Sequence, residues 1–193
     1  MWIIKIGGSL QDSDCLHAWL QAVARHGAGR LVLVPGGGRH ADAIRQAQRR
    51  FGFDDHEAHV RAIEAMETHA AELVGRQPGL QPASGEDAIR HTLQAGEVPV
   101  WLPAHMALGL SGLPASWDVS SDSLALWLAR HLGATGLIMV KSITVEADIP
   151  VAELSRAGII DRYFPLLYQR QAVPLVWCAR EQYGRLAEIL DRP

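Results

Sequence analysis

The sequence predicts an α/β protein, a three-layer αβα sandwich with a mainly parallel sheet. Short continuous apolar segments alternate with longer segments of helical periodicity along the 193 residues. Strands that are apolar along their whole length are typical of a parallel sheet whose two faces are both covered by helices. Because no repeat, low-complexity tract or linker interrupts this alternation, we expect residues 1–193 to form a single domain.

Five short apolar segments are predicted to be the strands, and the segments between them carry apolar residues at helical spacing. The segment Asp12-Ser13-Asp14 offers capping oxygens to the first helix, which Gly27 ends. The glycines and prolines of Gly75–Gly85 predict a loop, and Pro103–Trp117 is the longest irregular segment. The predicted strands are Trp2–Ile6, Leu31–Val34, Val98–Leu102, Leu137–Val140 and Val173–Cys178. The predicted helices lie at about residues 14–26, 39–51, 54–74, 86–94, 120–132, 151–156, 161–169 and 181–190.

Charge and composition argue against several classes of protein. Eighteen Lys and Arg residues against twenty-one Asp and Glu residues give a net charge of −3, so no global basic field is available to hold nucleic acid. No apolar run approaches the roughly 18 residues that a membrane helix needs, and the N-terminus does not read as a secretory signal. Cys15 and Cys178 are too few for a disulfide framework and suggest a reducing compartment. We therefore expect a cytoplasmic protein without nucleic-acid or membrane partners.

Two glycine clusters follow the first two predicted strands: Gly7 and Gly8, then Gly36, Gly37 and Gly38. Ligands of open parallel sheets bind outside the carboxyl ends of the strands, where backbone N–H groups of glycine loops can surround phosphate oxygens. A tight turn is the commoner reason for any single glycine. Five glycines in two strand-to-helix loops nevertheless favour an anion-binding site, although neither the P-loop signature nor the dinucleotide signature matches.

The chain contains sixteen arginines and only two lysines, Lys5 and Lys141. Lys5 is the penultimate residue of the first predicted strand, and Lys141 directly follows the strand Leu137–Val140. Both lysines are therefore predicted to lie at the carboxyl edge of the sheet. A lysine in such a position can extend to solvent, which is the usual case. The shortage of lysine elsewhere and the glycines beside Lys5 favour a functional role for Lys5, and the two alternatives are evenly balanced for Lys141.

Three further charged residues are candidates for this site. Asp118 and Asp122 are four residues apart at the start of a predicted helix, where aspartates are equally common as ordinary caps. Ionised beside the positive helix end, they suit orienting a lysine or a metal-bound nucleotide better than donating a proton. Arg39 directly follows the glycine triplet and can either meet an anionic acceptor or be solvated. His56, His59 and His69 are predicted to lie on a polar helix face rather than to bind metal.

The chain resembles the amino acid kinase superfamily in three motifs and in their order. The motifs are Lys5-Ile6-Gly7-Gly8-Ser9, Pro35-Gly36-Gly37-Gly38 and Asp118-x-x-x-Asp122. That superfamily includes acetylglutamate kinase, aspartokinase, uridylate kinase and isopentenyl phosphate kinase. The resemblance extends to about Ile143. The short length and the segment 117–123 look most like the small aspartokinase-related branch, whose members phosphorylate an aminomethyl-furan-methyl phosphate to the diphosphate in methanofuran synthesis.

The resemblance implies a role for each matching residue. Lys5 matches the lysine that bridges the transferring phosphoryl group, and Asp122 matches the aspartate that organises the catalytic lysines. Gly7, Gly8 and Ser9 match the loop around the nucleotide phosphates. The substrate-binding positions implied in this way, with Arg39 added for its place beside the glycines, are Gly36, Gly37, Gly38, Arg39 and Asp118.

Two departures from the family pattern stand out. The family usually has an aspartate-containing turn where this chain reads Lys141-Ser142-Ile143-Thr144, and it often has a second catalytic lysine in its C-terminal third. No lysine follows Lys141. Either Lys141 takes that catalytic and nucleotide-binding part, or the nucleotide site is altered.

The resemblance thus implies an ATP-dependent kinase with a small phosphate or carboxylate acceptor. Mg²⁺ would be carried by the nucleotide, no metal site of the protein's own is expected, and a homodimer or higher homo-oligomer is implied. A non-catalytic nucleotide- or anion-binding protein on the same fold is the alternative.

Overall fold

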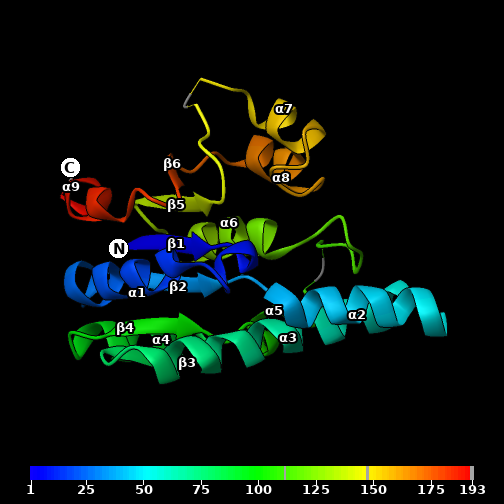
Figure 1. Ribbon diagram of the computed structural model, residues 1–193, viewed down its shortest axis with the longest axis horizontal. Helices are drawn as coiled ribbons and strands as arrows, with labels where there is room; N and C mark the ends of the chain where they lie inside the picture. The colour runs from blue at the N-terminus through cyan, green and yellow to red at the C-terminus, as the bar shows by residue number, and fades with distance from the viewer. Residues whose placement is uncertain (111, 147, 192–193) are drawn as a thin grey trace.

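The computed structural model describes residues 1–110, 112–146 and 148–191. Its centre is a six-stranded sheet with the order β3-β4-β2-β1-β5-β6, in which every pair of neighbouring strands is parallel (Figure 1). The strands are β1 Trp2–Ile6, β2 Leu31–Pro35, β3 Leu80–Ala83, β4 Val98–Trp101, β5 Gly136–Lys141 and β6 Leu175–Ala179. The predicted α/β architecture with a parallel sheet is therefore confirmed.

Helices connect the strands and cover both faces of the sheet. They are α1 Asp14–Gly27, α2 Gly38–Phe51, α3 Asp55–Arg76, α4 Glu86–Gln94, α5 Ala104–Ala107, α6 Ser121–His131, α7 Val151–Arg156, α8 Phe164–Arg170 and α9 Leu186–Leu190. Two short 3₁₀ turns add Gly8–Leu10 and Tyr183–Arg185. Helix α2 runs along α3, and both extend beyond the sheet (Figure 1).

The two faces of the sheet bury separate apolar cores. Because side chains alternate along a strand, Ile4 and Ile6 of β1 pack on the face covered by α1 and α9, where Trp19 is fully buried. Ile3 packs on the opposite face with residues of α6 and α8. The same alternation places Lys5 on the α6 face, two residues beyond Ile3.

The structure corrects one sequence-based expectation about the sheet. Strand β3 lies inside Gly75–Gly85, which the glycines and prolines predict to be a loop. Pro82 is tolerated there because β3 is the edge strand and pairs only with β4. The other differences are small: α5 forms within Pro103–Trp117, and the closing helix is divided into a 3₁₀ turn and α9.

Candidate active site

Two lysines from neighbouring strands meet one aspartate at the carboxyl edge of the sheet. Lys5 is on the α6 face of β1. Lys141 is on the same face of β5 as Leu137 and Met139, because side chains alternate along a strand, and both of these residues belong to the core on the α6 side of the sheet. Asp122, in the first turn of α6, lies between them. Lys5 Nζ is 2.7 Å from Asp122 Oδ1, and Lys141 Nζ donates hydrogen bonds of 2.8 Å to both carboxylate oxygens. Strand alternation and the start of α6 thus bring together three residues that are far apart in the sequence.

This charge cluster of Lys5, Asp122 and Lys141 is buried. The three residues are only 5%, 5% and 8% exposed. Burial and the charge of Lys5 lower the pKa of Lys141 to about 8, although Asp122 acts in the opposite direction. Burial would raise the pKa of Asp122, but the two ammonium groups outweigh it and hold that pKa below its ordinary value. Asp122 is therefore ionised at neutral pH, and the cluster carries one net positive charge when both lysines are protonated.

Asp161, which sequence reasoning did not identify, fixes the start of α6. Its Oδ2 accepts hydrogen bonds from the Ser120 N–H, the Ser120 hydroxyl and the Ser123 N–H, at 2.8–2.9 Å. Its Oδ1 accepts from the Ser123 hydroxyl and from the Phe164 N–H that begins α8. One carboxylate therefore ties α8 to the turn that carries Asp122. An aspartate before a predicted helix is an ordinary cap, so nothing in the sequence distinguished this one.

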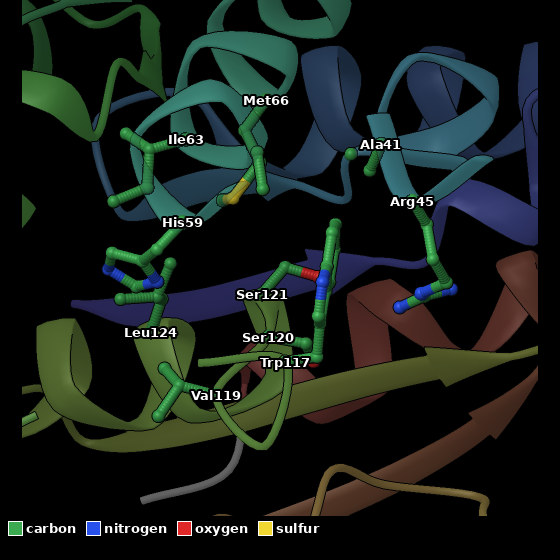
Figure 2. A pocket seen from close by; sticks show the side chains of 12 residues that line it. Ala41, Arg45, His59, Ile63, Met66, Trp117, Val119, Ser120, Ser121 and Leu124 are labelled. Atoms are coloured by element: carbon green, nitrogen blue, oxygen red, sulfur yellow. The ribbon is translucent and has the colours of Figure 1, made fainter. Parts of the chain in front are cut away.

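Two cavities lie in this region of the structure. The first, here called the β1–β5 cleft, is lined by residues that include Lys5, Gly7, Gly8, Ser9, Lys141 and Ser142. The second, here called the α2–α3 cavity, has residues from three segments in its walls, including Gly37, Arg45, His59, Ile63, Trp117 and Ser121 (Figure 2). Lys5 and Lys141 line the cleft, whereas the α2–α3 cavity is related to the cluster through Ser121, which directly precedes Asp122 in the sequence. The cleft and the cavity are therefore the candidate sites for two reactants.

The two glycine loops touch through their backbones. A Cβ atom on Gly8 would overlap the backbone of Gly38, and one on Gly36 would overlap the backbone nitrogen of Gly8. Gly7 is different, because a Cβ there would make only ordinary contacts of 3.4–3.5 Å. Close approach of the loops therefore requires Gly8 and Gly36 to be glycines, whether or not their N–H groups also hold phosphate.

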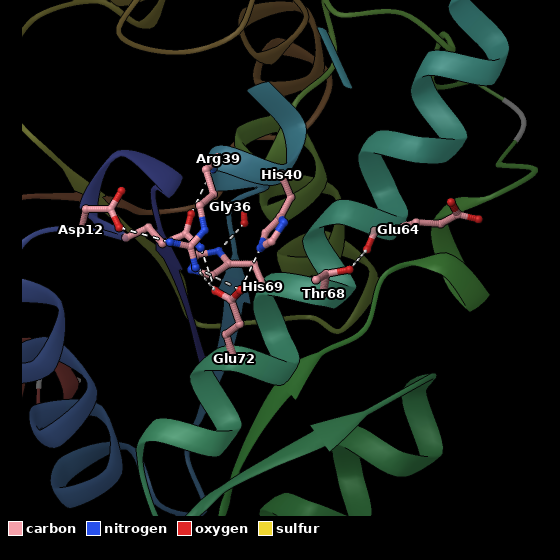
Figure 3. Close-up of polar contacts among 9 residues, drawn as sticks. Asp12, Gly36, Arg39, His40, Glu64, Thr68, His69 and Glu72 are labelled. Atoms are coloured by element: carbon pink, nitrogen blue, oxygen red, sulfur yellow. Dashed lines mark hydrogen bonds and ion pairs between the residues drawn. The ribbon is translucent and has the colours of Figure 1, made fainter. Parts of the chain in front are cut away.

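A partly exposed carboxylate group of α3 contacts residues that follow each of the two loops (Figure 3). Glu72 accepts hydrogen bonds from Gln11 at 2.7 Å, from His40 at 2.8 Å and from Arg39 at 3.2 Å. Burial would raise the pKa of Glu72, but these three donors together with the charge of Arg39 lower it to about 2. Gln11 follows the first glycine loop, whereas Arg39 and His40 follow the second. Glu72 thus fixes the position of one loop relative to the other.

His69 corrects the expectation of a polar histidine face on α3. It is fully buried, and its Nδ1 lies 2.6 Å from the Gly36 carbonyl oxygen, which can only accept, so Nδ1 carries the proton (Figure 3). Burial lowers the pKa of His69, which favours the neutral ring. His69 supports the second glycine loop, whereas His56 is exposed as expected.

Arg39 and Asp118 do not join the charge cluster. Arg39 is half-exposed and is engaged by Glu72 and Asp12. Asp118 has a 56% exposed side chain that lies 3.8 Å from Arg162, and it lines a separate surface hollow between its own segment and α7. Neither side chain lines the β1–β5 cleft or the α2–α3 cavity among the described residues.

Residues 1–144, three quarters of the chain, match the amino acid kinase family, and this stretch contains Lys5, both glycine loops, Asp122 and Lys141. The chain belongs to the amino acid kinase family. It is accordingly an ATP-dependent kinase that acts on a small molecule.

Individual relatives agree with this membership. The chain is 24% identical over 164 residues to a [5-(aminomethyl)furan-3-yl]methyl phosphate kinase from Methanocaldococcus jannaschii, covering 84% of this chain and 69% of that protein. Its fold is similar to that of uridylate kinase from Archaeoglobus fulgidus, with a TM-score of 0.69, 15% identity and coverage of 97% and 95% of the two chains. Isopentenyl phosphate kinase has a TM-score of 0.60 with 18% identity, covering 98% and 96%.

No helix among the described residues of this kinase is long and apolar enough to cross a membrane.

The close contact between Gly8 and Gly38 should make Gly8→Ala destabilising. The added methyl group has no room beside Gly38, so the loops must move apart. We expect the free energy of unfolding to fall by about 1–3 kcal/mol, as for other overpacked sites, and kinase activity to fall by at least about tenfold. Urea unfolding and ADP production measure the two effects.

Gly75→Ala is the matched control. Gly75 lies in α3 with open space around its Cβ position, so the same substitution should stabilise the protein by about 0.5–1 kcal/mol and leave activity unchanged. Wild-type stability and activity in Gly8→Ala would show that the loops do not need their close contact.

Proposed function

We propose that this kinase transfers the γ-phosphoryl group of ATP to a small acceptor that is itself a phosphate or carboxylate. The observation that carries the proposal is the charge cluster itself, in which Lys5 and Lys141 meet Asp122 and line the β1–β5 cleft together with the first glycine loop. ATP would place its phosphates in the cleft, beside Gly7, Gly8, Ser9 and Lys141. The acceptor would lie in the cavity, beside Gly36, Gly37 and Gly38.

The chemistry required is positioning and charge stabilisation. An acceptor oxygen forms a bond to the γ-phosphorus while the bond from that phosphorus to the β,γ-bridging oxygen breaks, and ADP leaves. Negative charge spreads over the transferring group in the transition state. Lys5 and Lys141 would stabilise this charge, and Asp122 would hold their ammonium groups in place.

An anionic acceptor is favoured because the cluster holds no available base. Both oxygens of Asp122 accept hydrogen bonds from ammonium groups, and its lowered pKa makes it a weak proton acceptor. A phosphate or carboxylate oxygen is already deprotonated at neutral pH and needs no base. A hydroxyl acceptor would require one.

We further propose an aminomethyl-furan-methyl phosphate as the acceptor and its diphosphate as the product, in the synthesis of a methanofuran-type cofactor. The name of the Methanocaldococcus jannaschii relative supports this choice.

Mg²⁺ would enter with the nucleotide. The described residues that line the β1–β5 cleft include lysines, glycines and serines but no Asp or Glu, so they suit a metal ion held by the phosphates and water better than one held by the protein. Such an ion would neutralise part of the phosphate charge.

The non-catalytic alternative rests on two departures from the family pattern, the altered turn at Lys141-Ser142-Ile143-Thr144 and the absence of a lysine in the C-terminal third. The second departure carries less weight because Lys141 offers a second ammonium group to Asp122 from β5. This favours the first of the two possibilities for Lys141, a catalytic role that also contacts the nucleotide phosphates.

We also propose a cytoplasmic homodimer or higher homo-oligomer. The family resemblance supports the assembly, and the two cysteines, too few for a disulfide framework, support the compartment. Sedimentation velocity of the purified chain tests the oligomeric state.

The proposed activity is tested by ADP production from ATP and Mg²⁺ with aminomethyl-furan-methyl phosphate, uridine monophosphate, isopentenyl phosphate and a carboxylate acceptor. We expect acceptor-dependent ADP with the furan compound and little with the others. Nucleotide binding by calorimetry without ADP from any acceptor would favour the non-catalytic alternative.

Lys5→Met should lower kcat by about 10²–10³-fold, because it removes one positioned charge from the transition state, with a smaller effect on the KM for ATP. Asp122→Asn should lower kcat similarly and should also reduce the free energy of unfolding by about 3–5 kcal/mol, because it leaves two buried ammonium groups without a counter-charge. The double variant should lose less activity than the two single effects combined, since the residues act as a unit.

Arg180→Met, which breaks an exposed ion pair with Glu181, is the control and should leave kcat unchanged. An unchanged kcat in Lys5→Met would contradict the assignment of Lys5.

The lowered pKa of Lys141 predicts an alkaline limit for activity. Lys141 is cationic below its pKa of about 8 and loses its charge above it, so kcat/KM for ATP should fall as the pH rises through about 8. Stability should change in the opposite direction. The pKa of Lys141 is lower in the folded chain than its ordinary 10.5, so its contribution to the free energy of unfolding increases between about pH 8 and 10.5.

Initial rates and urea unfolding from pH 6 to 10 check both trends. A kcat/KM that stays constant to pH 10 would remove Lys141 from the nucleotide-binding step.

A further inference from the structure

The α2–α3 cavity has the form of a slot with one aromatic wall. Figure 2 shows the Trp117 ring edge-on, with Arg45 on one side of it and His59 and Ile63 on the other. Trp117 and the α3 side chains His59, Ile63 and Met66 all line this cavity. Because flat aromatic faces attract other flat rings in offset-stacked arrangements, a slot of this form suits a planar group better than a branched one.

Trp117 is held in place by two contacts with α2. Its Nε1–H donates a 2.6 Å hydrogen bond to Gln48 Oε1, and the Arg45 guanidinium carbon lies 4.4 Å from the ring centroid. The hydrogen bond and the cation–π contact both come from α2. The ring is thus fixed before a ligand enters, and its other face remains available to the cavity.

The phosphate end of an acceptor has a defined place in the same cavity. Gly37 and Ser121 are in its walls, and Ser121 directly precedes Asp122 of the charge cluster. An acceptor with its phosphate at Gly37 would therefore extend its body along Trp117. An ester of a ring carbinol, with one carbon between ring and phosphate, has that form.

The walls of the slot carry few groups that could recognise a charge on the acceptor outside its phosphate. None of the described residues that line the α2–α3 cavity is an Asp or Glu, and its titratable side chains are Arg45 and His59. Burial and the neighbouring His56 lower the pKa of His59, which favours its neutral ring. A cationic substituent on the acceptor would find no carboxylate partner among these walls.

We propose that Trp117 is the specificity-determining residue of this kinase, and that it selects phosphate esters of planar-ring carbinols by stacking on the ring. This inference rests on the proposed function and deepens it. Ring shape, rather than a charged substituent on the ring, decides which phosphate esters bind.

The test compares furan-3-ylmethyl phosphate, which has the ring but lacks the aminomethyl group, with 3-methylbutyl phosphate, which is aliphatic and also carries five carbons. Calorimetry measures both dissociation constants in the presence of a non-hydrolysable ATP analogue and Mg²⁺. The proteins are the wild type, Trp117→Leu, which removes the ring, and Trp117→Phe, which keeps an aromatic face but loses the hydrogen bond to Gln48.

We expect the wild type to bind the furan ester about tenfold more tightly than the aliphatic ester, a preference of the size that aromatic pairs give. Trp117→Leu should abolish the preference while leaving the affinity for the aliphatic ester within about threefold. Trp117→Phe should restore most of it. A purely structural role for Trp117 would instead weaken both esters equally in both variants.

The inference is overturned if the wild type does not prefer the ring, or if Trp117→Leu keeps the preference. ADP production with the same esters separates this inference from the proposed function. Selective binding without ADP formation would contradict the kinase reaction on these esters but not the slot. ADP formation at equal rates from both esters would contradict the slot but not the kinase.

Discussion

The buried carboxylate of Asp122 stabilises the buried ammonium groups of Lys5 and Lys141 at the carboxyl ends of strands β1 and β5. Lysines are rarely buried unless they are paired, because removing a charge from water is costly. Here Asp122 makes short contacts with both Lys5 and Lys141, and each lysine comes from a strand that is fixed on both sides by its neighbours. The result is an excess positive charge in a place from which water is largely excluded. Electrostatic attraction for phosphate is stronger there than at an exposed surface.

The position of Asp122 depends in turn on a second carboxylate that has no contact with the lysines' ammonium groups among the described hydrogen bonds. Asp161 accepts five hydrogen bonds and joins the start of α6 to the start of α8. In the same way, Glu72 joins the residues that follow the two glycine loops by accepting hydrogen bonds from both sides. The charges at the centre thus sit on rigid elements, and acids from two other parts of the chain determine how those elements meet.

Much of this arrangement could be predicted from the sequence, since it follows from periodicity. Strand alternation and the common direction of parallel strands already placed Lys5 and Lys141 at one edge, and a helix start placed Asp122 near it. The contacts of Asp161 with α6 and of Glu72 with the residues after the glycine loops could not be predicted, because they join groups at least 32 residues apart through side-chain packing. Strand β3 was missed because its proline indicates a loop unless the strand is known to be at the edge. Trp117 was used only as part of the segment 117–123, and its place in a cavity wall could not be predicted because only the fold leaves one of its faces open to a cavity.

The scarcity of lysine has a practical consequence. Apart from the α-amino group of Met1, every primary amine of this chain belongs to the charge cluster. An amine-specific label such as reductive ¹³C-methylation therefore introduces signals at the two ε-amino groups and the chain terminus, without the crowding that surface lysines cause in most proteins. Because the pKa of Lys141 is lowered to about 8, more of its amine is unprotonated at mildly alkaline pH than in an ordinary lysine. The use of arginine for surface charge thus confines an amine-directed spectroscopic label on side chains to the charge cluster.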